Sequence, residues 1–86
     1  MTLAVLHRIC NLPKGYSKVR YLGSTYGVTR TDFNQGKSIK LYAEDLAGTN
    51  FISCNYYSGA KNALKPCEMP AEKVVHFLEN YEYIKI

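Results

Sequence analysis

The feature that most restricts the fold of this chain is a pair of alternating segments around Leu22-Gly23-Ser24-Thr25. Glycine reaches positive φ without steric penalty, so Gly23-Ser24 can form the two-residue type II′ loop of a β-hairpin over residues 18–31. Pairing Leu22 with Thr25 then separates apolar from polar side chains. The apolar face holds Val19, Tyr21, Tyr26 and Val28, and the polar face holds Lys18, Arg20 and Thr29. A one-residue shift would mix the two sets, so we predict a hairpin with one buried face.

Two further strands are predicted after the turn signal at residues 34–37. Apolar and polar residues alternate over about 38–44, and residues about 50–57 are rich in aromatic and β-branched types. A short loop at 34–37 would pair Ile39 with Asp32, which is a poor core partner, and Leu41 with Arg30. We therefore expect a β-bulge or a displaced register near Asp32.

A C-terminal helix is predicted over about 70–81. Apolar residues recur there at i, i+3, i+4 and i+7, and Pro70 suits the first helical position because its missing N–H is not needed. The spacing is carried by Val74, Phe77, Leu78 and Tyr81. The fold class is therefore α+β, with a three- to four-stranded antiparallel sheet and this helix packed on one face.

The two ends of the chain are less regular. Thr2–Cys10 fits a short helix or a strand, and we favour the helix. The apolar tail at Tyr83, Ile84 and Ile86 is expected to add an edge strand or to cover one end of the sheet. The polar segment 58–65 is expected to be a loop.

Length and composition predict a single domain over residues 1–86. A chain of 86 residues buries only about 60–65% of its unfolded surface, so its core must be thin. The sequence has no internal repeat or linker-like stretch. It also has no apolar run of about 18 residues, so we expect a cytoplasmic protein without a membrane partner.

Catalysis has little support in the sequence. The two histidines, His7 and His76, fall in predicted surface positions, and the glycines match no phosphate-binding loop. Acidic residues lack the spacing of a calcium loop. We therefore predict a non-enzymatic protein with no catalytic residue, metal or cofactor.

The three cysteines argue against a disulfide framework and a zinc site, because they form an odd set without CxxC spacing. Cys54 lies on the apolar side of its predicted strand and is expected in the core. Cys67 lies beside the predicted helix start, whose amides would stabilise a thiolate, and is the candidate reactive thiol. A thiol redox protein is therefore the weakest of three hypotheses.

Charge and aromatic content carry the main functional hypothesis. Residues 1–40 have a net charge of +6 and residues 41–86 have −2, so one side of the molecule should be basic. The predicted sheet adds tyrosine to this charge, which is typical of surfaces that bind nucleic acid through phosphate contacts and stacking. The candidate binding residues are Lys18, Arg20, Arg30, Lys37, Lys40 and Tyr42.

The alternative hypothesis is a stoichiometric protein-binding inhibitor or adaptor, one form of which would target a nucleic-acid-handling machine. Its basis is the abundance of tyrosine, eight residues of 86, because tyrosine and arginine favour protein interfaces. The partner is thus nucleic acid or an acidic protein surface. A homodimer through a sheet edge is also compatible with the sequence.

Overall fold

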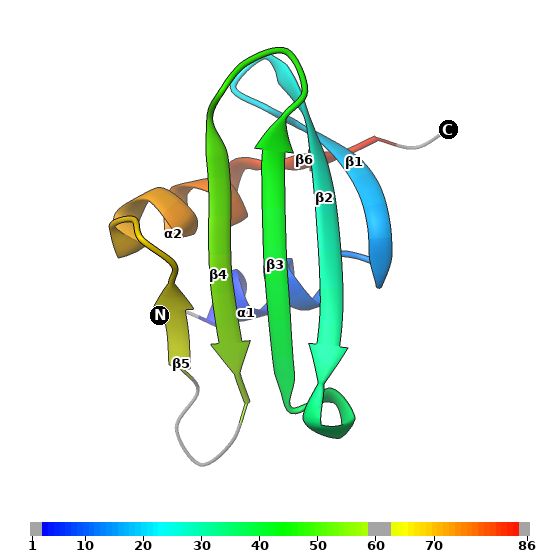
Figure 1. Cartoon of the computed structure of the whole chain (residues 1–86), viewed down its shortest axis with the longest axis vertical. Coiled ribbons are helices and arrows are strands. Elements are labelled where there is room, and N and C mark those ends of the chain that lie inside the picture. Colours follow the sequence, from blue (N-terminus) through cyan, green and yellow to red (C-terminus); the bar gives the residue numbers. More distant parts are fainter. Residues whose placement is uncertain (1–2, 59–62, 85–86) are drawn as a thin grey trace.

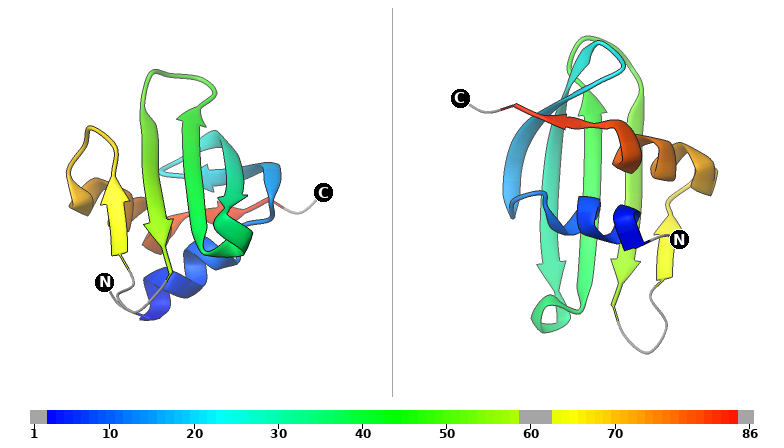
Figure 2. Two further views of the ribbon diagram at one scale, coloured as in Figure 1. Left: turned by 60° about the horizontal axis from the view of Figure 1, so that its bottom comes forward. Right: turned by 180° about the vertical axis from the view of Figure 1, so that it is seen from behind.

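A computed structural model describes residues 3–58 and 63–84 of the chain. These residues form a six-stranded antiparallel sheet with both helices on the same face (Figures 1 and 2). The elements in chain order are α1 (Leu3–Cys10), β1 (Gly15–Tyr21), β2 (Ser24–Phe33), the 3₁₀ turn η1 (Asn34–Gly36), β3 (Ser38–Asp45), β4 (Phe51–Tyr57), β5 (Ala63–Pro66), α2 (Ala71–Asn80) and β6 (Glu82–Tyr83). The strand order across the sheet is β5-β4-β3-β2-β1-β6.

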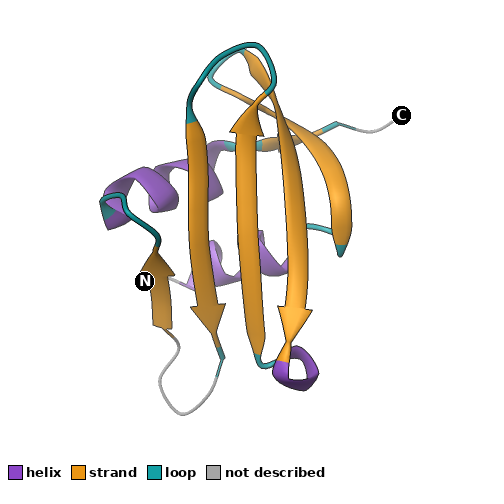
Figure 3. Ribbon diagram, in the orientation of Figure 1, coloured by secondary structure: helices purple, strands orange, loops and turns teal. Residues whose placement is uncertain are grey.

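The α+β class, the antiparallel sheet and the C-terminal helix are confirmed, but the expected three to four strands are too few (Figure 3). Strand β5 begins in the segment 58–65 that we expected to be a loop, and it pairs with the edge of β4; residues 59–62 of that segment lie outside the described residues. Tyr83 of the apolar tail pairs with Val19 in the two-residue strand β6, whereas Ile86 lies outside the described residues. The N-terminal helix that we favoured is present as α1.

The β1–β2 hairpin has a different turn from the predicted one. Tyr21 pairs with Ser24, so Leu22 and Gly23 form the loop, with φ values of 50° and 79°. Two successive positive φ angles define a type I′ turn, whose twist matches that of the flanking strands. The error moves each cross-strand partner by two residues and therefore leaves every side chain on its predicted face.

The β2–β3 pairing has the register that we rejected. Asp32 pairs with Ile39 and Arg30 pairs with Leu41, in a ladder that continues from Tyr26 to Phe33 without a bulge. The prediction of a bulge was wrong because the two charged residues neutralise each other on the same strand face, where Arg30 Nε donates to Asp32 Oδ1 at 2.9 Å.

The core lies between the sheet and the two helices, which cross its strands on one side (Figure 2). Leu41 at the centre of the sheet and Phe77 of α2 are both fully buried. The sheet contributes Val19, Tyr21, Tyr26, Val28, Ile39, Leu41, Ala43, Ile52, Cys54 and Tyr56 to the core, and α1, α2 and the segments that follow them contribute Val5, Ile9, Leu12, Val74, Phe77, Leu78 and Tyr81. Every inward residue predicted for the hairpin belongs to this set.

A reciprocal contact joins α1 to the C-terminal end of α2. Arg8 Nε donates to the Leu78 carbonyl oxygen at 2.8 Å, and the guanidinium also bonds to the Tyr81 carbonyl oxygen. The Tyr81 hydroxyl donates to the Arg8 carbonyl oxygen at 2.5 Å, and the guanidinium lies 3.9 Å from the Tyr81 ring centroid. Arg8 thus satisfies carbonyls at the C-terminal end of α2 that have no partner within the helix.

Within the described ranges, none of the helices has the length and apolar composition required to cross a lipid bilayer.

Candidate functional site

The candidate site is the face of the sheet opposite the helices, which we call the open face. Alternation along each strand assigns its residues, because neighbours of buried core residues point the other way. The pairing registers then order these side chains in rows that run across β1 to β4. Three successive rows, starting from the η1 end, are Phe33, Ser38 and Tyr57; then Thr31, Lys40 and Asn55; then Tyr16, Thr29, Tyr42 and Ser53. A fourth row holds Lys18, Gly27, Glu44 and Phe51.

Exposed aromatic side chains distinguish this face from an ordinary solvated surface. Five large rings lie on it, each between 37% and 59% exposed. They are Tyr16, Phe33, Tyr42, Phe51 and Tyr57. Singly scattered apolar side chains are normal on a protein surface, whereas several rings gathered on one sheet face make that face a candidate binding surface.

Three of these rings are held in place by their neighbours. Tyr42 and Phe51 stack with their centroids 6.0 Å apart and their planes inclined by 28°. Tyr16 extends over Gly27, where a Cβ atom would lie 2.5 Å from the tyrosine hydroxyl oxygen. The missing side chain of Gly27 therefore allows the Tyr16 ring to lie on the sheet.

Four basic side chains share the open face with these rings. Lys18 and Arg20 of β1 and Lys40 of β3 were predicted to be there, and Lys65 of β5 joins them by its pairing with Asn55. All four are exposed, and none has an acidic partner within 4.0 Å in the described part of the chain. Their charges are therefore available to an anionic ligand.

Two acidic residues limit the positive charge. Glu44 lies in the same row as Lys18, and Glu82 of β6 pairs with Arg20 at the edge of the sheet. The open face is thus moderately basic, with its least opposed cations, Lys40 and Lys65, in the row next to Phe33 and Tyr57.

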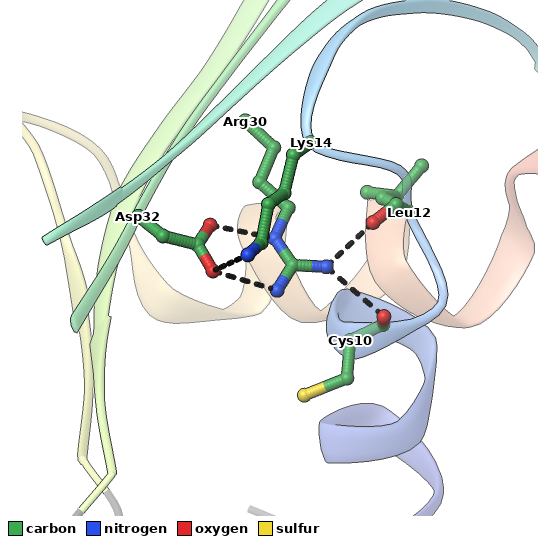
Figure 4. Close-up of polar contacts among 5 residues, drawn as sticks. All are labelled: Cys10, Leu12, Lys14, Arg30 and Asp32. Carbon is green, nitrogen blue, oxygen red and sulfur yellow. Dashed lines mark hydrogen bonds and ion pairs between the residues drawn. The ribbon is translucent and has the colours of Figure 1, made fainter. Parts of the chain in front are cut away.

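Arg30, a predicted binding residue, lies on the helix side of the sheet (Figure 4). Its side chain is 11% exposed and makes a two-point ion pair with Asp32, at 2.9 and 3.1 Å. Its Nη1 atom donates to the carbonyl oxygens of Cys10 and Leu12, at 3.0 and 2.5 Å. These are carbonyls at the C-terminal end of α1, where a cation also complements the helix dipole. Arg30 therefore fixes α1 to the sheet.

Lys37 is also separated from the other candidates. It caps the η1 turn with α-helical backbone angles (φ −81°, ψ −13°), so the alternation of β3, which begins at Ser38, does not place its side chain on either face. Lys37 is exposed in the turn and its carbonyl oxygen accepts a bond from the Ser58 amide at 2.8 Å. The structure thus brings together Lys18, Arg20, Lys40 and Tyr42 and leaves Arg30 and Lys37 elsewhere.

Several residues of the open face were not among the predicted ones. Phe51 and Tyr57 lie on the outward side of β4, which the alternation of Ile52, Cys54 and Tyr56 already indicated. Tyr16 precedes Lys18 by two residues and shares its face for the same reason. Lys65 had no such signal, because its strand was not recognised.

Cys67 does not have the expected environment of a helix N-terminus. Its amide donates to the Ser53 carbonyl oxygen at 2.9 Å and so continues the β4–β5 pairing, four residues before α2 begins. Its Sγ atom accepts a bond from Asn55 Nδ2 at 3.6 Å. No group of three or more potential metal ligands occurs within the described residues.

His76 is exposed, as expected, yet it has a defined partner. Its Nδ1 atom lies 2.5 Å from the hydroxyl oxygen of Tyr21, whose ring packs edge-on against Phe77. Burial, with a smaller contribution from Tyr26, raises the pKa of Tyr21. Burial also raises the pKa of the Cys54 thiol to about 12, so this residue is an inert part of the core.

Comparisons with protein-family models, curated proteins and solved structures identify no significant match for this chain.

Proposed function

We propose that this protein is a non-enzymatic module that binds single-stranded nucleic acid across the open face of its sheet. The observation that carries the proposal is the combination of five exposed rings with four basic side chains on one face. Phosphates attract the cations, and any base offers a π-face to the rings.

A single strand fits this surface better than a duplex does. The rings lie on a sheet face among their basic neighbours, where unstacked bases can reach them. In a duplex the bases are already paired and stacked, so mainly phosphates would contact the protein. Binding to a duplex would then use the charges without the aromatic contribution of about 1–3 kcal/mol per stacked base.

The direct test is fluorescence anisotropy with three labelled probes of about 15 nucleotides or base pairs, a length within the range of compact single-strand binders. The probes are oligothymidylate (dT15), oligouridylate (rU15) and a mixed-sequence duplex. We expect one of the single strands to bind at least about 5-fold more tightly than the duplex, because a single stacked base supplies about 1 kcal/mol.

Charge reversals locate the site. Lys40→Glu and Arg20→Glu should each weaken binding to the single strand, since each removes one phosphate contact and adds a repulsive charge to the open face. Lys14→Glu is the matched control, because it makes the same change of net charge at an exposed lysine beside Asp32, on the helix side of the sheet. Equal effects of Lys40→Glu and Lys14→Glu would contradict the assignment.

An acidic protein partner would use the same cations. It would be recovered from a pull-down in a form that resists nuclease, and the purified protein would then bind neither single-stranded probe. That pair of results would replace the nucleic-acid proposal with the inhibitor or adaptor hypothesis.

A further inference from the structure

We infer that one nucleic-acid base is sandwiched between Phe33 and Tyr57, in a slot whose floor is Ser38. This inference rests on the proposed function and names where on the open face a base is held. Both rings belong to the row nearest η1, and each flanks Ser38 through a direct strand pairing, Phe33 from β2 and Tyr57 from β4.

The separation of the two strands suits one planar ring. Antiparallel partners lie about 4.5–5.5 Å apart, so the Cα atoms of Phe33 and Tyr57 are about 10 Å apart across β3. A ring in contact with both side chains needs about 7–8 Å between them, twice the usual carbon–carbon contact distance. The two side chains are therefore attached far enough apart to hold one planar ring between them.

These two rings are also uncommitted, unlike Tyr42 and Phe51, which stack on each other. Phe33 is 48% exposed and Tyr57 is 40% exposed, and neither has a ring partner among the described residues. Between them Ser38 has a small side chain and is only 7% exposed, so neighbouring side chains cover it in the free protein and a base must part them to lie on it. A larger residue at position 38 would fill the slot.

Polar groups stand beside the slot. Asn34 Nδ2 donates to Ser38 Oγ at 3.0 Å, which leaves the Asn34 side-chain oxygen as an acceptor and the Ser38 hydroxyl hydrogen as a donor. Lys40 follows Ser38 by two residues on the same face, about 6.8 Å along the strand. That position allows Lys40 to contact the phosphate next to the sandwiched base, with Lys65 two strands away in the same row.

The test uses the absence of tryptophan from this chain. Tyr57→Trp places a single fluorescent ring in the slot, and Tyr83→Trp places one on an exposed tyrosine of β6, away from the open face. On titration with dT15 and rU15, we expect fluorescence quenching by stacking in Tyr57→Trp and an unchanged signal in Tyr83→Trp. An abasic oligonucleotide of the same length should leave both signals unchanged.

A second variant measures the contribution of the opposite ring. Phe33→Ala should weaken binding of the better single strand by about 5- to 140-fold, the range expected for loss of one base-stacking contact. Tyr83→Ala should leave the affinity unchanged. Phe33 is half-exposed, so its truncation should leave the folded state intact, which circular dichroism verifies.

The outcomes separate the two proposals. If wild-type protein binds dT15 or rU15 but Tyr57→Trp is not quenched, or Phe33→Ala binds as tightly as Tyr83→Ala, the slot is refuted and the proposed function stands. If the wild-type protein binds neither strand, both proposals are refuted. Quenching by only one of the two strands would identify DNA or RNA as the ligand of the slot.

Discussion

Replacement of Arg30 by methionine should destabilise the fold by about 3 kcal/mol, the lower end of the range for removing one partner of a buried ion pair. The variant keeps an unbranched chain of similar length but loses four hydrogen bonds, two to Asp32 and one each to the Cys10 and Leu12 carbonyls. The Asp32 carboxylate, whose side chain is 13% exposed, would retain only Lys14 at 4.0 Å. This partial access to water places the expected value at the lower end.

Urea unfolding followed by circular dichroism measures this free energy, and a thermal melt should show a midpoint lower by roughly 12–24 °C for a domain of this size. The double variant Arg30→Met/Asp32→Leu is the control for the orphaned charge. It should be more stable than Arg30→Met alone, because it leaves no carboxylate without its partner. A change below about 0.5 kcal/mol for Arg30→Met, the usual range for surface substitutions, would refute this role of Arg30.

Substitutions at Leu22, Cys54 and Gly27 test the hairpin turn, the buried thiol and the Tyr16 contact. Leu22→Asn should stabilise the protein by about 1 kcal/mol, as measured by urea unfolding. Asparagine tolerates the positive φ of the type I′ turn, and removal of the exposed leucine side chain costs little packing. A less stable variant would contradict this turn. The pKa of the Cys54 thiol is about 12 in the folded protein and 9.0 for a free thiol. As pH rises, the unfolded state therefore loses this proton before the folded state does. Up to about 4 kcal/mol of folding stability should be lost between pH 9 and pH 12. Cys54→Ala should show a shallower alkaline decline, and an identical decline would exclude the thiol as its source. Gly27→Ala should displace the Tyr16 ring and weaken single-strand binding about 5-fold or more. The free energy of unfolding should change by less than about 1 kcal/mol. In a Tyr16→Ala background, Gly27→Ala should have no further effect on binding.

Alternation within the strands allowed much of this fold to be predicted. Val19, Tyr21, Tyr26 and Val28 are buried as expected, although the turn between them was placed one residue too late. The face assignment survives this error because a two-residue change of partner preserves the side of each residue. Local sequence could not decide between the turns, since type I′ requires a positive φ at Leu22, a residue that seldom adopts it.

Contacts between distant segments were beyond such reasoning. Arg30 and Asp32 look like poor core partners until α1 is placed beside them, because two of the groups that Arg30 satisfies are carbonyls 18 and 20 residues earlier in the chain. Strand β5 has only four residues and depends on the edge of β4 for its pairing. Its sequence alone therefore resembles a loop.

The candidate site was predictable to the extent that it follows from alternation. Lys18, Arg20, Lys40 and Tyr42 share the open face as their strands indicated. Phe51 and Tyr57 follow by the same rule, but recognising Phe33 and Tyr57 as a pair requires the order of strands β2, β3 and β4. Charge alone was misleading for Arg30, since it does not reveal which cations already have a partner inside the fold.

The most direct test of the open face as the binding surface is the salt dependence of the dissociation constant for the better of dT15 and rU15. If Lys18, Arg20, Lys40 and Lys65 each neutralise one phosphate, the logarithm of the association constant should fall with log salt at a slope of about −2.8, so the dissociation constant should rise roughly 50-fold between 50 and 200 mM. Lys40→Gln should reduce the slope to about −2.1, whereas Lys14→Gln, on the helix side, should leave it unchanged. A flat response, or equal losses for these two variants, would contradict the account.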